Sequence, residues 1–250
     1  MIVPSWGPSW TGTRRHRLLA LIAVRNGMRY LSGFLRNVAP QVDGIIALDD
    51  GSTDGSAELL AGDAAVLELL RNPVDRAGWD EVGNHRALIA AARRHAAHWV
   101  ICVDADERLE EQFRPRAERV IARGNLLGYS AYALHLRELW DEPGQYRVDG
   151  IWGRKSVARF FRLRADHAFD PRELHGHKAP MQGLRRGRFP KADLTIYHLA
   201  MIAAADRTAR RERYEKADPD SHWQKIGYTY LTDSSGLTLR RLSRGRGFSD

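Results

Sequence analysis

Residues 49–56 read DDGSTDGS and directly follow the apolar run IIAL at residues 45–48. A short apolar run bounded by turn residues is typical of a strand buried on both faces of a parallel sheet. Asp49 and Asp50 therefore stand at the carboxyl end of a predicted strand, which is where open α/β sheets bind their ligands. The small residues that follow, Gly51 among them, allow a ligand to approach the backbone closely.

A second acidic cluster has the same setting about 55 residues later in the chain. Residues 99–103 read WVICV, and Asp104-Ala105-Asp106-Glu107 follow them. Because the carboxyl ends of parallel strands meet at one edge of a sheet, we expect both clusters to line one site. Carboxylates accept hydrogen bonds from a base or ribose, and they hold the Mg²⁺ or Mn²⁺ that accompanies phosphates.

The remaining pattern predicts an α/β fold, in which a mostly parallel sheet is flanked by helices and the C-terminal half is mixed. In the first half we expect strands at 18–24 and 64–70, and helices at 28–38, 82–97 and 113–122, with a further helix that is capped by Asp54 or Ser56 and runs through Leu60. In the second half we expect strands at 129–140, 156–163 and 194–199, and a helix at about 202–216.

Net charge, cysteine content and the length of the apolar runs limit the possible partners and location of the protein. The net charge of +8 favours anionic partners such as nucleotide phosphates, nucleic acid or an anionic membrane face, without choosing among them. Cys102, the single cysteine, lies in an apolar run and is expected to be a core residue, so no intramolecular disulfide can form. The apolar run at 18–24 is too short to span a bilayer. We expect a cytoplasmic protein, with contact at the inner membrane face left open.

The stretch at 49–56 has two other interpretations. Asp50, Ser52, Asp54 and Gly55 match positions one, three, five and six of a calcium loop, but position twelve is Ala61, where a bidentate Glu is needed. A capped turn with solvated acids is the other interpretation. The presence of two acidic clusters at two strand ends favours a ligand site over both.

Together these segments resemble family 2 glycosyltransferases with the GT-A fold. The resemblance covers about residues 16–115 and is carried by VRN at 24–26, DDGSTDGS at 49–56, GNHR at 83–86 and WVICVDADE at 99–107. It implies a nucleotide-sugar-dependent hexosyl or related transferase, metal-dependent and inverting, of the kind used in cell envelope or glycan biosynthesis. The donor would be a UDP-, GDP- or dTDP-sugar, and the acceptor a glycan, a lipid-linked molecule or a small molecule.

The resemblance also implies roles for individual residues. The nucleotide would be bound by Val24, Asn26, Asp49, Asp50, Ser52 and Asp104. A Mn²⁺ or Mg²⁺ ion would be held by Asp106 and Asp104, and His198, which ends a predicted strand, would complete that site.

The catalytic base is the least defined part of the prediction. Where related enzymes have His-Glu, or a Glu-Asp pair, this chain has His175-Gly176, and Gly27 stands where many members have Glu. Inverting transfer needs a carboxylate that removes the acceptor's proton. Glu173 is the first candidate, followed by Asp170 and His175.

The expected organisation is an arm, two halves of one domain, and an extension. The segments are a flexible arm at 1–15, a nucleotide-sugar-binding half at 16–125, an acceptor and catalytic half at 126–218, and a partly mobile extension at 219–250.

A catalytically silent GT-A protein that only binds nucleotide sugars is the alternative function. Nucleic-acid binding would rest on charge alone, because no recognised nucleic-acid motif supports it, and at most peripheral membrane contact is expected.

Overall fold

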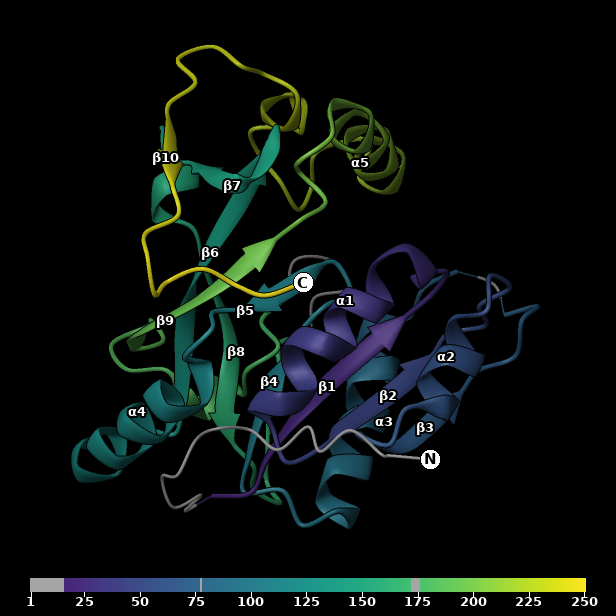
Figure 1. Ribbon diagram of the computed structural model, residues 1–250, viewed down its shortest axis with the longest axis vertical. Helices are drawn as coiled ribbons and strands as arrows, with labels where there is room; N and C mark the ends of the chain where they lie inside the picture. Colours follow the sequence, from purple (N-terminus) through teal and green to yellow (C-terminus); the bar gives the residue numbers. More distant parts are fainter. Residues whose placement is uncertain (1–15, 77, 172–175) are drawn as a thin grey trace, which may run out of the picture.

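A computed structural model describes residues 16–76, 78–171 and 176–250, and these fold around one mixed sheet (Figure 1). The ten strands of the described residues are β1 (Leu18–Val24), β2 (Ile45–Asp49), β3 (Val66–Arg71), β4 (Trp99–Cys102), β5 (Glu107–Leu109), β6 (Ala131–Trp140), β7 (Glu142–Arg147), β8 (Ser156–Arg162), β9 (Lys191–His198) and β10 (Leu239–Arg241). The α-helices are α1 (Met28–Val38), α2 (Ser56–Gly62), α3 (Glu81–Arg94), α4 (Phe113–Leu127) and α5 (Ala204–Ala217).

The first half of the chain forms a parallel sheet. β1 lies at its centre, paired in parallel with β2 on one side and with β4 on the other, and β3 extends the sheet beyond β2. Parallel neighbours require crossover connections, which α1, α2 and α3 supply in this half. The carboxyl ends of β2 and β4 thus flank the end of β1, as the sequence predicts.

The second half adds antiparallel pairs to the same sheet. β8 pairs antiparallel with β4, and β6 then pairs antiparallel with both β8 and β7. β9 runs parallel to β6 and antiparallel to β5, which directly follows the second acidic cluster. These pairings confirm the expected mixed C-terminal half.

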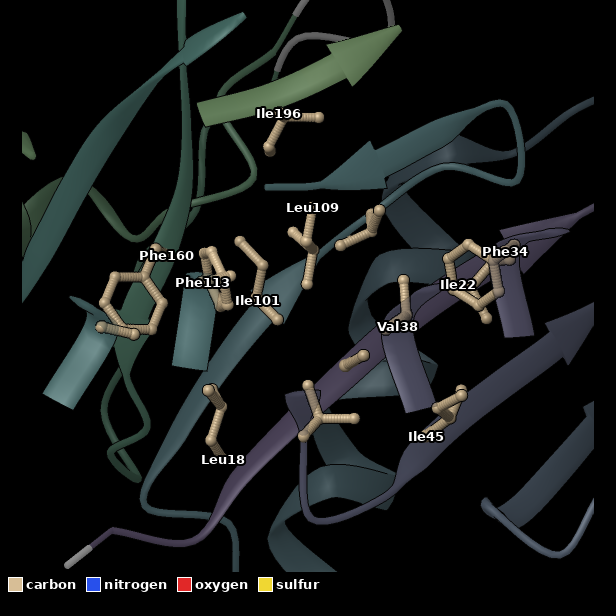
Figure 2. Close-up of a cluster of buried hydrophobic side chains, with 14 of the residues drawn as sticks. Leu18, Ile22, Phe34, Val38, Ile45, Ile101, Leu109, Phe113, Phe160 and Ile196 are labelled. Carbon is tan, nitrogen blue, oxygen red and sulfur yellow. The ribbon is translucent and has the colours of Figure 1, made fainter. Parts of the chain in front are cut away.

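Alternation along the central strands divides the core between the two faces of the sheet. In β1, Leu18, Ala20 and Ile22 face the cluster that includes side chains of α1 and α4 (Figure 2), whereas Leu19 and Leu21 face the α3 side. Because both faces are covered, successive positions are all apolar. This explains why these strands read as unbroken hydrophobic runs. Cys102 is buried, as expected, and its thiol is free.

Three described strands were not expected from the sequence. No strand is expected between residues 141 and 155, but this segment contains β7, which pairs with β6 and with the equally unexpected β10. The third is β5, which is only three residues long. Short charged or Pro- and Gly-containing strands such as these carry no clear alternation, so their pairing partners decide their structure.

Of the two expected terminal segments, the structure describes the C-terminal extension. The arm at 1–15 lies outside the described residues. In the extension, Phe248 packs against Tyr197 and Arg246 pairs with Asp193, so it contacts the sheet well beyond β10. Among the described residues no helix is long and apolar enough to cross a membrane.

Candidate active site

Asp50 is buried at the end of β2 within a polar network. Its Oδ1 accepts hydrogen bonds from Asn72 Nδ2 at 2.5 Å and from Arg76 Nη1 at 3.1 Å. The same two donors reach Oδ1 of Asn84, on α3, at 3.0 and 3.1 Å. Three segments therefore meet at this carboxylate: the end of β2, the loop after β3 and the first turns of α3.

Several buried polar atoms at this edge lack a partner. Within the described residues, Asp49 Oδ1, Asp50 Oδ2 and Asn84 Nδ2 make no hydrogen bond. Each unpaired buried group costs about 1–3 kcal/mol, so a ligand that pairs with them is stabilised. Two acceptors and one donor suit a ligand that carries both N–H or O–H groups and acceptor oxygens. Val24 adjoins them, since its carbonyl accepts from the Asp50 amide at 2.8 Å.

Asn26 and Ser52 join two loops of the site. Ser52 Oγ accepts from the Asn26 amide at 2.9 Å, and Asn26 Oδ1 accepts from the Thr53 amide at 2.9 Å. Ser56 Oγ accepts from the Gly27 amide, also at 2.9 Å. These contacts fix the turn after β1 against the turn after β2, so this part of the acidic stretch holds the wall of the site in place.

Asp104 is held between two cations. Lys178 Nζ lies 2.8 Å from its Oδ1 and Arg159 Nη2 lies 2.9 Å from its Oδ2. Burial raises the pKa of this carboxyl, but the two cations outweigh burial and hold the pKa below its ordinary value. Arg159 also binds Glu107 at 2.5 Å, and burial raises the pKa of Glu107 to about 7.

Asp106 faces His198 across the sheet edge. Oδ2 of Asp106 lies 3.1 Å from Nε2 of His198, while the carboxylate of Glu138 binds Nδ1 and is itself bound by Lys155. Strand register explains this, because His198 on β9 pairs directly with Glu138 on β6 and with Glu107 on β5. Burial lowers the pKa of His198, but the two carboxylates outweigh it and raise the pKa to about 10.

Asp106 and His198 fit a divalent cation as two neighbouring ligands. A carboxylate oxygen and an imidazole nitrogen suit Mn²⁺, and a carboxylate on the other ring nitrogen is the usual support behind a metal-binding His. Over the described ranges no group of three or more His, Cys, Asp or Glu could hold a metal. Phosphates and water would therefore supply the other ligands. Asp104, also predicted as a ligand, is bound by its two cations.

Asp170 lies at a hollow beside Asp104. The hollow contains about 350 Å³ of space, part of it open to solvent, and Glu81, His85 and Lys178 line it together with Asp170. Asp170 Oδ2 accepts from the His177 amide at 3.2 Å. The other two candidates for the base, Glu173 and His175, lie outside the described residues.

Trp79, Trp140 and Trp152, whose rings could stack on a sugar, have different environments. Trp79 is 48% exposed and lines a hollow of about 310 Å³ with Glu81 and Lys178. Trp140 and Trp152 are buried, and the guanidinium of Arg147 lies 4.6 and 5.3 Å from their ring centroids. Of these three, Trp79 is the one whose ring is open to a sugar.

Residues 20–133 match the model of the family described as Glycosyl transferase family 2. This part of the chain is similar to glycosyl transferase family 2. It contains both acidic clusters and the Asn84 network, and it confirms the resemblance derived from the sequence.

Relatives of this chain include two uncharacterized proteins, one of Mycobacterium tuberculosis and one of Mycobacterium bovis. Each is 26% identical to it over 211 residues, which is 82% of this chain and 51% of the relative. The chain thus spans about half the length of these curated relatives.

One solved structure is similar to this chain over most of its length. The crystal structure of S. aureus TarS matches with a TM-score of 0.51 and 10% identity, over 84% of this chain and 44% of that one. At this identity the likeness concerns the fold alone, and it confirms the GT-A fold. Glucosyl-3-phosphoglycerate synthase from M. tuberculosis, solved with Mn²⁺ and UDP, matches with a TM-score of 0.36 and 19% identity, over 50% of this chain and 45% of that one.

Several residues of the candidate site are missed by sequence reasoning. Glu138 stands in a strand that is otherwise mostly buried and apolar, and an acid in that position is a detectable signal. Asn72, Arg76 and Arg210 have no such signal. Arg159 and Lys178 likewise have no signal in the sequence, but both bind Asp104.

Proposed function

We propose that this chain transfers a sugar from a nucleoside diphosphate donor to a hydroxyl group of an acceptor, with inversion at the anomeric carbon. One observation carries the proposal. At a single sheet edge, the buried oxygens of Asp49 and Asp50 that lack partners lie beside the end of β1, and the Asp106–His198 pair lies on its other side. The first group suits a nucleoside, and the second suits a cation that accompanies phosphates.

The nucleoside part of the donor would pair with the unpaired atoms at the end of β2. Asp49 and Asp50 accept from base N–H or ribose O–H groups, Asn84 donates, and Val24, Asn26 and Ser52 form the adjoining wall. Asp104 then lies on the ribose side. UDP-, GDP- and dTDP-sugars all present such donors and acceptors, so the base is to be found by experiment.

A Mn²⁺ or Mg²⁺ ion would be held by Asp106 and His198, with Asp104 nearby. When bound, the ion neutralises charge that develops on the departing diphosphate. Glu138 orients the His198 ring, and Lys178 and Arg159 add positive charge on the same side. The positive charge of these two cations stabilises the negative charge of the departing diphosphate, and neither of them forms a bond to the sugar.

The acceptor hydroxyl would enter from the hollow that Asp170 lines. Glu173 is the proposed base, and Asp170 and His175 are the other candidates. A glycan, a lipid-linked molecule or a small molecule are the acceptor classes. A role in cell envelope or glycan biosynthesis, in the cytoplasm or at the inner membrane face, belongs to the same proposal.

The metal assignment is tested by the release of nucleoside diphosphate from sugar nucleotides. We expect Asp106→Asn to reduce Mn²⁺-dependent release about 100-fold or more, because a charged ligand becomes neutral. Asp220→Asn, an exposed position outside the site, serves as the matched control and should match the wild type. Unchanged release by the Asp106 variant would show that the metal assignment is wrong.

The base assignment needs a separate measurement. Glu173→Gln should lower kcat about 100-fold, within the range attributed to general base catalysis, while donor binding by calorimetry stays the same. Wild-type turnover by this variant would move the assignment to Asp170 or His175. Donor binding without release under any condition would favour a silent binding protein.

A further inference from the structure

The guanidinium of Arg210 lies against the ring atom that would bind the cation. Its Nη1 is 2.9 Å from Nε2 of His198, the same nitrogen that lies 3.1 Å from Oδ2 of Asp106. Its Nη2 donates to the hydroxyl of Tyr214 at 3.2 Å, one turn further along α5. A positive side chain on the C-terminal half therefore reaches the carboxylate–imidazole pair.

This contact and a bound cation exclude each other. Glu138 binds Nδ1 of His198, which leaves Nε2 as the ring atom that faces Asp106. A metal ion held by this pair would need direct access to both Nε2 and the carboxylate oxygen of Asp106. A guanidinium has donors only and no lone pair for a metal, and its positive charge repels the ion. Arg210 therefore takes the position that a cation needs.

The present arrangement also leaves Nε2 with two competing neighbours. A ring nitrogen carries either one proton or one lone pair, so it can donate to Asp106 or accept from Arg210, but it cannot do both. A metal ion would accept the lone pair of Nε2 and bind Asp106 at the same time. Displacement of Arg210 by a cation would thus resolve the conflict, provided the guanidinium gains another anionic partner.

We propose that Arg210 is a built-in counter-ion that keeps the cation site closed until the donor arrives. The diphosphate of the donor then draws the guanidinium away from His198, because phosphate oxygens bind a guanidinium through two parallel hydrogen bonds. This proposal rests on the proposed function. Under this proposal, Mn²⁺ and the nucleoside diphosphate bind cooperatively. Each of the two ligands raises the affinity for the other by the same factor.

The test is a Mn²⁺ titration of the full chain, in which electron paramagnetic resonance measures free Mn²⁺ with and without UDP. We expect the wild type to bind Mn²⁺ weakly alone and more tightly with UDP. Arg210→Gln should bind Mn²⁺ alone about tenfold more tightly than the wild type, which is a change of about 1.4 kcal/mol in binding free energy. UDP should then increase the Mn²⁺ affinity of this variant less than it increases that of the wild type. Arg210→Lys retains the charge and should stay close to the wild type.

Arg213→Gln is the matched control. It removes an exposed guanidinium from the same helix, and that group lies 5.4 Å from the ring centroid of Tyr214, as Arg210 does. The control should titrate like the wild type. If Arg210→Gln has a wild-type melting temperature and binds Mn²⁺ alone no more tightly than the wild type, the proposal is overturned.

Failure of this proposal can be told apart from failure of the proposed function. If only the role of Arg210 is wrong, the wild type still binds UDP with Mn²⁺ and still releases nucleoside diphosphate. If the proposed function is wrong, no sugar nucleotide binds to or is turned over by the wild type, and the Arg210 proposal fails with it.

Discussion

At the scale of single residues, His85 is a titratable group in a largely buried environment. Its Nε2 has no partner in the described part of the chain, and its ring stands edge-on to Phe169 with centroids 4.8 Å apart. Burial, aided by the charge of Lys178, lowers the pKa to about 4. The pKa in the unfolded chain is about 6.5. The unfolded state therefore binds more protons in this window, and stability is lost as the pH falls from about 6.5 through 4.

We predict that His85 makes the protein acid-sensitive. On going from pH 7.5 to pH 5, the wild type should lose about 2 kcal/mol more unfolding free energy than His85→Gln, as the linkage of the two pKa values requires. Urea unfolding of both proteins at both pH values measures this difference. Equal losses would mean that His85 titrates normally in the folded state.

At the scale of secondary-structure elements, Arg159 joins β8 to the turn after β4. Its guanidinium binds the partly exposed Asp104 and the buried Glu107. Removal of one member of a buried ion pair leaves an uncompensated charge and costs about 3–5 kcal/mol. We predict this loss for Arg159→Met, measured by urea unfolding at pH 8, where Glu107 is ionised.

Arg162→Met is the control for this prediction, since Arg162 is on the same strand but exposed. Its unfolding free energy should change by less than about 0.5 kcal/mol. A second variant, Arg159→Met with Glu107→Gln, should recover part of the loss because one buried charge is removed. Similar stability of Arg159→Met and Arg162→Met would contradict the structural role of Arg159.

The elements also show how far the sequence predicts the structure. β1, β2 and β4 are predicted nearly to the residue because burial on both faces makes them continuous apolar runs. β7 and β10 are missed because their pairing depends on each other rather than on their own pattern.

The candidate site likewise contains residues that the sequence predicts and residues that it does not. The acidic clusters are predictable, since each follows an apolar run directly in the chain. The contact of His198 with Glu138 is not, because it depends on the register of two strands that are 60 residues apart in sequence at this pair. Arg210 reaches the same point from α5, and no sequence pattern distinguishes it from the other Arg residues of that helix.

At the scale of the whole molecule, the C-terminal segment returns across the sheet (Figure 1). Phe248 packs on Tyr197 with centroids 5.2 Å apart, Arg246 binds Asp193, and the Ser249 carbonyl accepts from Asn37 at 3.0 Å. The segment therefore links β9 to α1, which belong to different halves of the chain.

We predict that Phe248→Ala releases this segment without unfolding the rest. Trypsin should cleave the variant at Arg240–Arg246 several times faster than the wild type, because local opening exposes these basic residues. Mass spectrometry of early fragments identifies the cleaved bonds. Equal cleavage rates would show that the aromatic contact does not hold the segment.

The central claim is that the sheet edge around Asp50 binds the nucleoside of a sugar nucleotide. The most direct measurement is a thermal-shift screen of UDP-, GDP- and dTDP-sugars, with and without Mn²⁺, on the wild type and on Asp50→Asn. A ligand that binds only the folded state raises the melting temperature. We predict that at least one donor raises it for the wild type by about 3 °C or more with Mn²⁺, and by much less for Asp50→Asn. No shift with any donor, or equal shifts in both proteins, would contradict the account.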